Sequence, residues 1–259
     1  MESKFHIESL DDGFRLYNVL YCRELYVVDW STELLDNGRA HTQDRWLKWL
    51  KSDENEDKWQ LASGPLYYAV LSALHYNRKN HPDKEQKELI QQCRAMHAQD
   101  FKDHWMITST RVIYTPQGKD KLIHDYGSQQ QQEIELDFVG PDKYIRNYSG
   151  LEQEVNALLG TNNVEEVEQV YHDLTSKKPY LGRMNNKPDR ERHQSLALWD
   201  NYFIIYTNRF IDDNCRLARG VVVHPANEFY QKSTMRGALS LVGDAGNLSL
   251  ADSGNVSLK

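Results

Sequence analysis

The sequence predicts an α+β protein: a mostly antiparallel sheet with helices packed on one face, followed by a C-terminal arm of repeated β-like segments. Residues 106–139 contain strand patterns separated by turn residues, and residues 63–103 contain two helical patterns directly before them. Helices and strands also do not alternate singly, as they do in parallel α/β folds. These three observations carry the prediction.

The N-terminal segment, residues 9–31, contains two competing patterns. Apolar residues alternate over 14–20 as in a strand, yet Tyr17 and Tyr21 are also spaced as neighbours on one helix face. We predict a helix early in this segment and a strand over residues 25–30.

Three helices are predicted next. A short amphipathic helix covers residues 42–50. Ser63 and Pro65 then form a helix start, and the residues that follow are apolar around most of the circumference, which indicates a buried helix. Pro82 separates it from another helix that ends near Asp103.

The central strands are predicted over 106–115, 121–126 and 133–139. Side chains alternate across each of them, and Pro116 and Gly118 supply a turn between the first two. In the third strand the apolar side chains face one way and the acidic ones face water, as in an antiparallel strand with one wet face.

The C-terminal half repeats the theme of helices followed by strands. A capping box at Ser149 opens a helix that Gly160 closes, and Asn163 caps a second helix. Residues 177–193 are predicted to form a polar loop, and long loops are frequent binding sites. Later strands are predicted at 196–199, 202–207 and 217–223.

Three segments are predicted along the chain: 1–148, with helices and a three-stranded sheet; 149–236, with two helices and strands; and a tail over 237–259. A sheet continuous between the first two segments is an equal alternative. The tail carries three near-copies of one motif, Gly237-Ala-Leu-Ser-Leu, Gly246-Asn-Leu-Ser-Leu and Gly254-Asn-Val-Ser-Leu. Each suits one short strand that could stack in a meander or add to a sheet edge of another chain, including a second copy.

Composition limits the classes of partner. The net charge of −7 argues against broad nucleic-acid binding, because phosphate neutralisation needs a basic face. No apolar run reaches the roughly 20 residues that span a bilayer. The first residues contain no apolar signal core, and the three cysteines have no metal-type spacing, so we expect reduced thiols and a cytoplasmic location.

An arginine, a serine and a glutamate pair follow one another along the chain: Arg23, Ser109 within Thr-Ser-Thr, and Glu133 with Glu135. This order resembles the arginine, serine and glutamate arrangement of ADP-ribosyltransferases. The resemblance implies NAD as the cofactor, with Arg23 on its phosphates, Ser109 at the nicotinamide, Glu135 stabilising the ribose cation and Glu133 orienting the acceptor. The alternative is a solvated strand face that needs no cofactor.

Two further sets of residues are candidates for ligand binding. The loop 177–193 contains Arg183, Lys187, Arg190 and Arg192 and could bind an anion, although an ordinary solvated loop has the same composition. His97, Asp100 and His104 share a helix face at spacings of three and four, which suits zinc or another divalent ion. Locally hydrogen-bonded histidines are the alternative.

The central hairpin carries Arg111, His124 and Asp125. Arg111 and Asp125 are expected to form a cross-strand ion pair. No phosphate loop, nucleophile elbow or dinucleotide motif occurs in the sequence. The sequence therefore favours a binding or regulatory protein that contacts a protein or small ligand and uses its tail for association, with the NAD-dependent transferase as the alternative.

Overall fold

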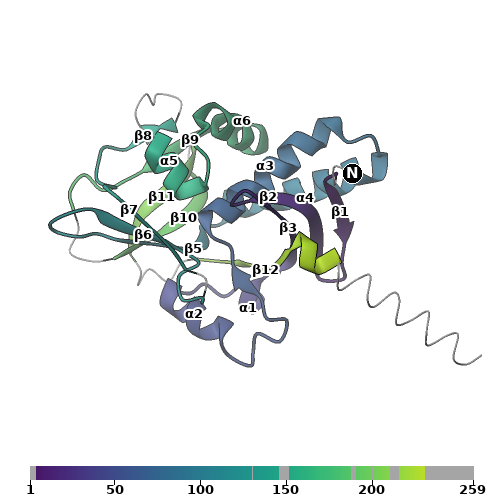
Figure 1. Ribbon diagram of the computed structural model, residues 1–259, viewed down its shortest axis with the longest axis horizontal. Helices are drawn as coiled ribbons and strands as arrows, with labels where there is room; N and C mark the ends of the chain where they lie inside the picture. Colours follow the sequence, from purple (N-terminus) through teal and green to yellow (C-terminus); the bar gives the residue numbers. More distant parts are fainter. Residues whose placement is uncertain are drawn as a thin grey trace, which may run out of the picture.

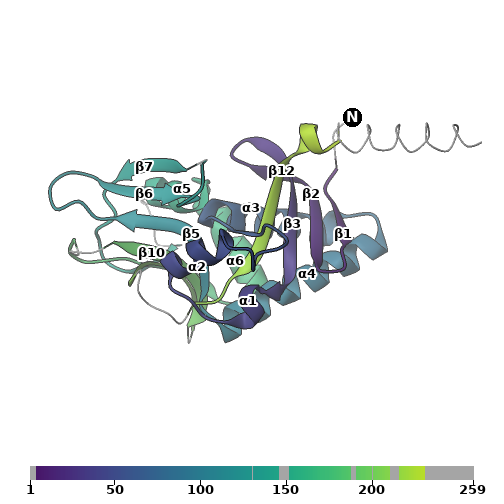
Figure 2. The same ribbon diagram turned by 90° about the horizontal axis from the view of Figure 1, so that it is seen from below.

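The computed structural model describes residues 4–129, 131–145, 152–187, 191–199, 201–210 and 216–230. It contains helices and antiparallel-rich sheets, which confirms the predicted α+β class. The tail repeats from residue 237 onward lie outside the described residues. Figures 1 and 2 show the arrangement of the elements in two perpendicular views.

The first sheet has five strands in the order β1-β2-β3-β12-β4, and every pairing is antiparallel. Its β12 strand, from near the end of the described chain, lies beside the N-terminal β3 (Figures 1 and 2). The strands are β1 (His6–Ser9), β2 (Gly13–Tyr21), β3 (Glu24–Leu34), β4 (Gln60–Leu61) and β12 (Arg219–Pro225).

The prediction of an early helix in residues 9–31 is wrong, because both halves of this segment are strands. The misleading feature is an irregularity in β2 between Leu16 and Val19, where Asn18 has a φ of 60°. Such a bulge shifts the phase of the alternation. Phe14 and Leu16 are buried before the shift, and Val19 and Tyr21 are buried after it.

The second sheet has seven strands in the order β7-β6-β5-β10-β11-β9-β8. All its pairings are antiparallel except the one between β9 and β11. Its strands are β5 (Met106–Ile113), β6 (Asp120–His124), β7 (Gln132–Leu136), β8 (Lys143–Tyr144), β9 (Lys178–Gly182), β10 (Arg192–Trp199) and β11 (Tyr202–Phe210).

Strands from the second half of the chain enter both sheets. β10 lies between β5 and β11, while β12 lies between β3 and β4. The polar loop expected over 177–193 is wrong at both ends, because β9 occupies Lys178–Gly182 and β10 begins at Arg192. In β9, the alternation of Tyr180 with the buried Leu181 is too short to stand out among the basic residues around it.

Four helices pack between and against the two sheets and bury the main core. The predicted helices over 63–80 and from residue 83 to 103 are confirmed, with Asp83 capping the second by accepting from the backbone N–H groups of Glu85 and Gln86. The aromatic core joins both sheets to the helices. These helices are α3 (Gly64–Asn80), α4 (Lys84–Asp103), α5 (Glu152–Leu159) and α6 (Val164–Thr175).

The opposite side of β5 is covered by α2 (Gln43–Leu50), which follows the single turn α1 (Leu35–Gly38). Trp46 of α2 is fully buried in a smaller apolar cluster with Ile107 of β5. Gln43 donates to the carbonyl oxygens of Thr108 and Thr110. None of the described helices is both long and apolar enough to pass through a lipid bilayer.

Candidate functional site: a groove along α3 and an adjoining cavity

A groove of about 660 Å³ runs along one side of α3. One wall is the end of β2 with the β2–β3 turn, and the far end is formed by the connection between α5 and α6. From α3 it is lined by the small Ala69, Ser72 and Ala73 and by larger residues, Pro65, Tyr68, Tyr76 and Asn77. The small residues share one helix face and leave room between the larger ones.

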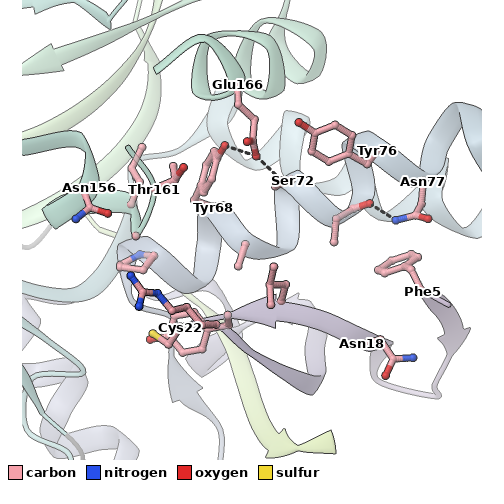
Figure 3. A pocket seen from close by; sticks show the side chains of 18 residues that line it. Phe5, Asn18, Cys22, Tyr68, Ser72, Tyr76, Asn77, Asn156, Thr161 and Glu166 are labelled. Atoms are coloured by element: carbon pink, nitrogen blue, oxygen red, sulfur yellow. Dashed lines mark hydrogen bonds between the residues drawn. The ribbon is translucent and has the colours of Figure 1, made fainter. Parts of the chain in front are cut away.

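The wall of the groove opposite the end of β2 contains the hydrogen-bonded carboxylate of Glu166. Glu166 of α6 accepts hydrogen bonds from the Tyr68 hydroxyl at 2.8 Å and the Ser72 hydroxyl at 3.0 Å. Figure 3 shows Tyr68 and Ser72 pointing from α3 toward Glu166. The carboxylate also accepts from the Asn163 amide at 3.2 Å. Several of its acceptor sites are thus already used to hold α3 against α6.

The wall formed by the β2–β3 turn carries a thiol and a guanidinium group. Cys22 and Arg23 form the two-residue turn between β2 and β3, with φ angles of 50° and 69°. This is the left-handed geometry that tight hairpins require. Arg23 is exposed, and among the described residues no carboxylate lies within ion-pair distance of it. The groove is therefore lined by the guanidinium group of Arg23, which has no carboxylate partner among the described residues.

The edge of β2 beside the groove is partly open. β1 pairs with β2 only from Phe14 to Tyr17, whereas β3 pairs with β2 up to Tyr21. Among the described residues, 18–21 have a strand partner on one side only, and the Asn18 side-chain amide donates to the Lys4 carbonyl at 2.8 Å. Asn18, Leu20 and Tyr21 of this stretch line the groove.

A second, smaller cavity of about 280 Å³ lies at the junction of the two sheets. Its apolar lining comes from Leu47 and Leu50 of α2 and from Trp59 and Leu61 around β4. Its polar lining includes Ser109 of β5 and the turn that follows β6, which begins with Asp125.

The Asp125 carboxylate links this cavity to the groove. It accepts from the Ser109 hydroxyl at 3.2 Å and from the Tyr21 hydroxyl at 3.4 Å, and the Tyr21 oxygen lies 3.2 Å from the Ser63 hydroxyl. Burial raises the pKa of Asp125 above its ordinary value. Within the described part of the chain, no basic side chain is within ion-pair distance of this carboxylate.

The expected ion pair between Arg111 and Asp125 is not formed. Asp125 leaves the end of β6 with a φ of 51° and turns toward Ser109 and Tyr21. Arg111 instead binds Asp44 and, at 3.1 Å, Glu191, and its guanidinium lies 3.7 Å from the centre of the Tyr126 ring. The strand register could not reveal this, because Asp125 lies beyond the last paired residue of β6.

The residues that resemble an ADP-ribosyltransferase site lie on separate surfaces. Arg23 lines the groove, Ser109 lines the second cavity, and Glu133 and Glu135 are exposed on β7. Glu133 forms an ion pair of 2.7 Å with Lys121 on the neighbouring strand. Sequence order alone did not place the glutamates relative to Ser109, because β6 separates β7 from β5.

The basic residues expected to bind an anion contact protein groups. Arg183 is buried and donates to Glu154 at 3.2 Å, and Lys187 forms an ion pair with Asp120 at 3.0 Å. Arg192 is buried as well and donates to the Glu191 carbonyl. Arg190 lies outside the described residues.

The three residues considered for a metal have different environments. His97 is fully buried against Trp30, at 4.9 Å between ring centres. Asp100 makes a two-pronged ion pair with Arg219, at 2.5 and 2.7 Å. His104 is the half-buried C-cap of α4. Across the described ranges, no group of three or more His, Cys, Asp or Glu side chains is arranged to hold a metal ion.

The chain matches no family model, no curated protein and no solved structure. The groove and the cavity must therefore be interpreted from their own chemistry. The sequence contained two usable signals for them: the small residues Ala69, Ser72 and Ala73 on one helix face, and the turn residues Asp125 to Gly127 after a strand.

Proposed function

We propose that this protein is a peptide-binding module that takes an extended segment into the α3 groove as an added strand beside β2. The observation that carries the proposal is the open edge of β2 over residues 18–21, which borders the groove. Strand addition supplies affinity through backbone hydrogen bonds and selectivity through pockets for alternate side chains.

The length of the groove suits a short extended chain. α3 lines it from Pro65 to Asn77, which is twelve residue steps and about 18 Å at about 1.5 Å per residue. An extended chain advances about 3.3 Å per residue, so about five residues fill this length. The motif repeated in the tail is also five residues long.

The side chains around the groove indicate what the segment carries. Leu20 is 63 % exposed and Tyr76 is 46 % exposed, so apolar surface is available on both walls. Arg23 adds one free positive charge. A segment of alternating apolar residues with a neighbouring carboxylate complements these features.

The tail of a second copy is the segment that fits this description. Its repeats place leucine or valine on alternate positions, and Asp244 and Asp252 lie between them. The last described residue, Tyr230, donates a hydrogen bond to the side chain of Asn18 at 3.2 Å, and Asn18 lines the groove. The described part of the chain therefore ends next to a residue that lines the groove. We include a cytoplasmic location in the proposal, because Cys22 and Cys93 are both free thiols.

The test is a titration of a fluorescein-labelled peptide of residues 244–259, followed by fluorescence anisotropy. The titrant is the full-length chain with its own repeats disabled, so that they cannot compete. Serine replaces Leu239, Leu241, Leu248, Leu250, Val256 and Leu258. We expect a saturable rise in anisotropy that unlabelled peptide reverses, and light scattering should show a larger mass for the wild-type chain than for the disabled one.

Two pairs of variants locate the binding site. Ala73→Phe fills the groove and should abolish binding, whereas Ala95→Phe on an exposed position of α4 should not. Arg23→Glu should weaken binding by about tenfold or about 1.4 kcal/mol, whereas Arg45→Glu on α2 should leave it unchanged. Absence of saturable binding, or equal binding by Ala73→Phe and Ala95→Phe, would contradict the proposal.

A further inference from the structure

The second cavity contains an uncompensated carboxylate. A buried charge is costly unless it is paired, so structural carboxylates in protein interiors usually have a cationic partner. Asp125 has hydroxyl partners, Ser109 and Tyr21, but among the described residues no ion pair. Its left-handed φ of 51° is one that aspartate adopts more readily than most residues. Within the described ranges, the chain thus places a carboxylate at the cavity without pairing it in a salt bridge.

The opposite charge lies at the rim of the same cavity. Lys51 and Lys58 both line the cavity and are exposed, whereas Asp125 is half-buried and Ser109 beside it is only 4 % exposed. Within the described ranges neither lysine is within ion-pair distance of an acidic group. The cavity is therefore negative at its inner end and positive at its mouth.

Apolar and aromatic side chains lie between these two ends. The buried Trp59 lines the cavity together with Leu47 and Leu50 from α2. The volume of about 280 Å³ is just below the range of about 300–1,000 Å³ that is typical for drug-sized ligands. The occupant must accordingly be small.

From this arrangement we infer that the cavity binds a free α-amino acid with an apolar side chain. Its ammonium group pairs with Asp125 and receives support from the Ser109 hydroxyl, and its carboxylate faces Lys51 and Lys58. The side chain packs against Trp59 and the leucines of α2. This site is separate from the α3 groove, and the inference does not depend on peptide binding there.

Charge complementarity distinguishes this occupant from simpler ones. A plain carboxylic acid would satisfy the lysines but would bring a second negative charge toward Asp125. An amine without a carboxylate would pair with Asp125, but the two lysines at the mouth of the cavity would repel its positive charge. Only a ligand with both charges, ordered from ammonium inside to carboxylate outside, matches both ends of the cavity.

The test is isothermal titration calorimetry of the full-length protein with L-phenylalanine, L-leucine, 2-phenylethylamine and 3-phenylpropanoate. At least one amino acid should bind, and L-phenylalanine should bind at least about tenfold more tightly than either analogue that lacks one charge. Lowering the pH through the raised pKa of Asp125 should weaken amino-acid binding, because the protonated carboxyl no longer attracts the ammonium.

Variants separate the two ends of the site. Asp125→Asn preserves the left-handed turn, because asparagine tolerates this conformation. The variant should bind L-phenylalanine no more tightly than it binds 3-phenylpropanoate. The double variant Lys51→Gln, Lys58→Gln should bind L-phenylalanine and 2-phenylethylamine with equal affinity. Asp53→Asn, at an exposed acid of the same loop outside the cavity lining, is the matched control and should change nothing.

Three results would overturn the inference. These are no heat with either amino acid, equal affinity of the wild type for L-phenylalanine and 3-phenylpropanoate, and unchanged binding by Asp125→Asn. Circular dichroism of each variant shows whether a lost heat reflects a lost fold. If Asp125→Asn does not fold, the double lysine variant decides alone, since its residues are exposed.

Discussion

Asp100 is a buried carboxylate and Asp125 is a half-buried one, and the two also differ in the groups that surround them. Asp100 on α4 is 5 % exposed and receives two hydrogen bonds from the guanidinium of Arg219 on β12. Asp125 receives hydroxyl donors only, and it lines a cavity. Arg219 neutralises the Asp100 carboxylate, whereas among the described residues no cationic side chain neutralises Asp125.

The pairing of Asp100 indicates a structural role, whereas the unpaired Asp125 suits a role in ligand binding. Arg219 also donates to the carbonyl oxygens of Ser31 and Thr32, so the Asp100 pair fastens α4 to the junction of β3 and β12. Removal of one partner from such a pair costs stability. A lone carboxylate beside a cavity does not stabilise the native state and is a common mark of a functional site.

The largest predicted effect tests the architectural side of this comparison. Asp100→Asn leaves the buried Arg219 without its counter-charge, and the free energy of unfolding should fall by about 3–5 kcal/mol. Urea denaturation followed by tryptophan fluorescence measures this loss. A loss below about 1 kcal/mol would mean that the pair contributes no more than a surface ion pair does, and the contrast with Asp125 would disappear.

The second prediction uses another buried group near this pair. His97 is fully buried, neither ring nitrogen has a hydrogen-bond partner among the described residues, and burial lowers its pKa to about 3. The unfolded chain has a histidine pKa of about 6.5. Between these two values the unfolded state binds the extra proton, so stability falls as the pH decreases through this window.

His97→Phe should remove this dependence. Between pH 7 and pH 5 the wild type should lose about 2 kcal/mol more than the variant, because one pKa unit corresponds to about 1.4 kcal/mol. Any overpacking by the phenyl ring would shift the curve equally at each pH and leave its slope unaffected. His124, whose pKa burial lowers to about 4, should retain its own contribution in the variant. Parallel urea midpoints for both proteins over this range would show that His97 is protonated in the native state.

The smallest predicted effect concerns Asp125 itself. Its native pKa lies above the unfolded value, so the native state binds more protons between the two values and the ionised group weakens the fold at neutral pH. Asp125→Asn should therefore raise the free energy of unfolding at pH 7 by less than about 1 kcal/mol, and the gain should vanish as the pH falls through the raised pKa. A loss comparable to that of Asp100→Asn would assign Asp125 to the architecture.

Elements with a strong local period could be predicted from the sequence. The helices α3 and α4 and the strands β5, β6 and β7 occur where apolar spacing and turn residues agreed. β2 failed because a bulge at Asn18 broke its alternation, and β9 failed because its burial depends on pairing with β11. The first failure comes from an irregularity in the local β2–β3 hairpin, whereas the second comes from a partner strand that lies further along the chain.

The candidate sites were harder to predict for the second of these reasons. Arg23 and Ser109 were selected from the sequence, and both line hollows, but different ones. Asp125 was expected to pair with Arg111, and the competing partners of Arg111 are supplied by α2 and by Glu191. A local pattern can nominate a charged residue, but only the assembled fold shows whether that charge is neutralised.

The position of β12 also constrains how the molecule is made. Gly220 donates its backbone N–H to the Ser31 hydroxyl across 189 residues, and β4 pairs with β12 alone. During synthesis, β1 to β3 must wait with an unsatisfied edge until residue 225 has left the ribosome. Such non-local closure slows folding, because a long loop must be ordered before its contacts repay the entropy. Until then the β3 edge is open to pairing with other chains.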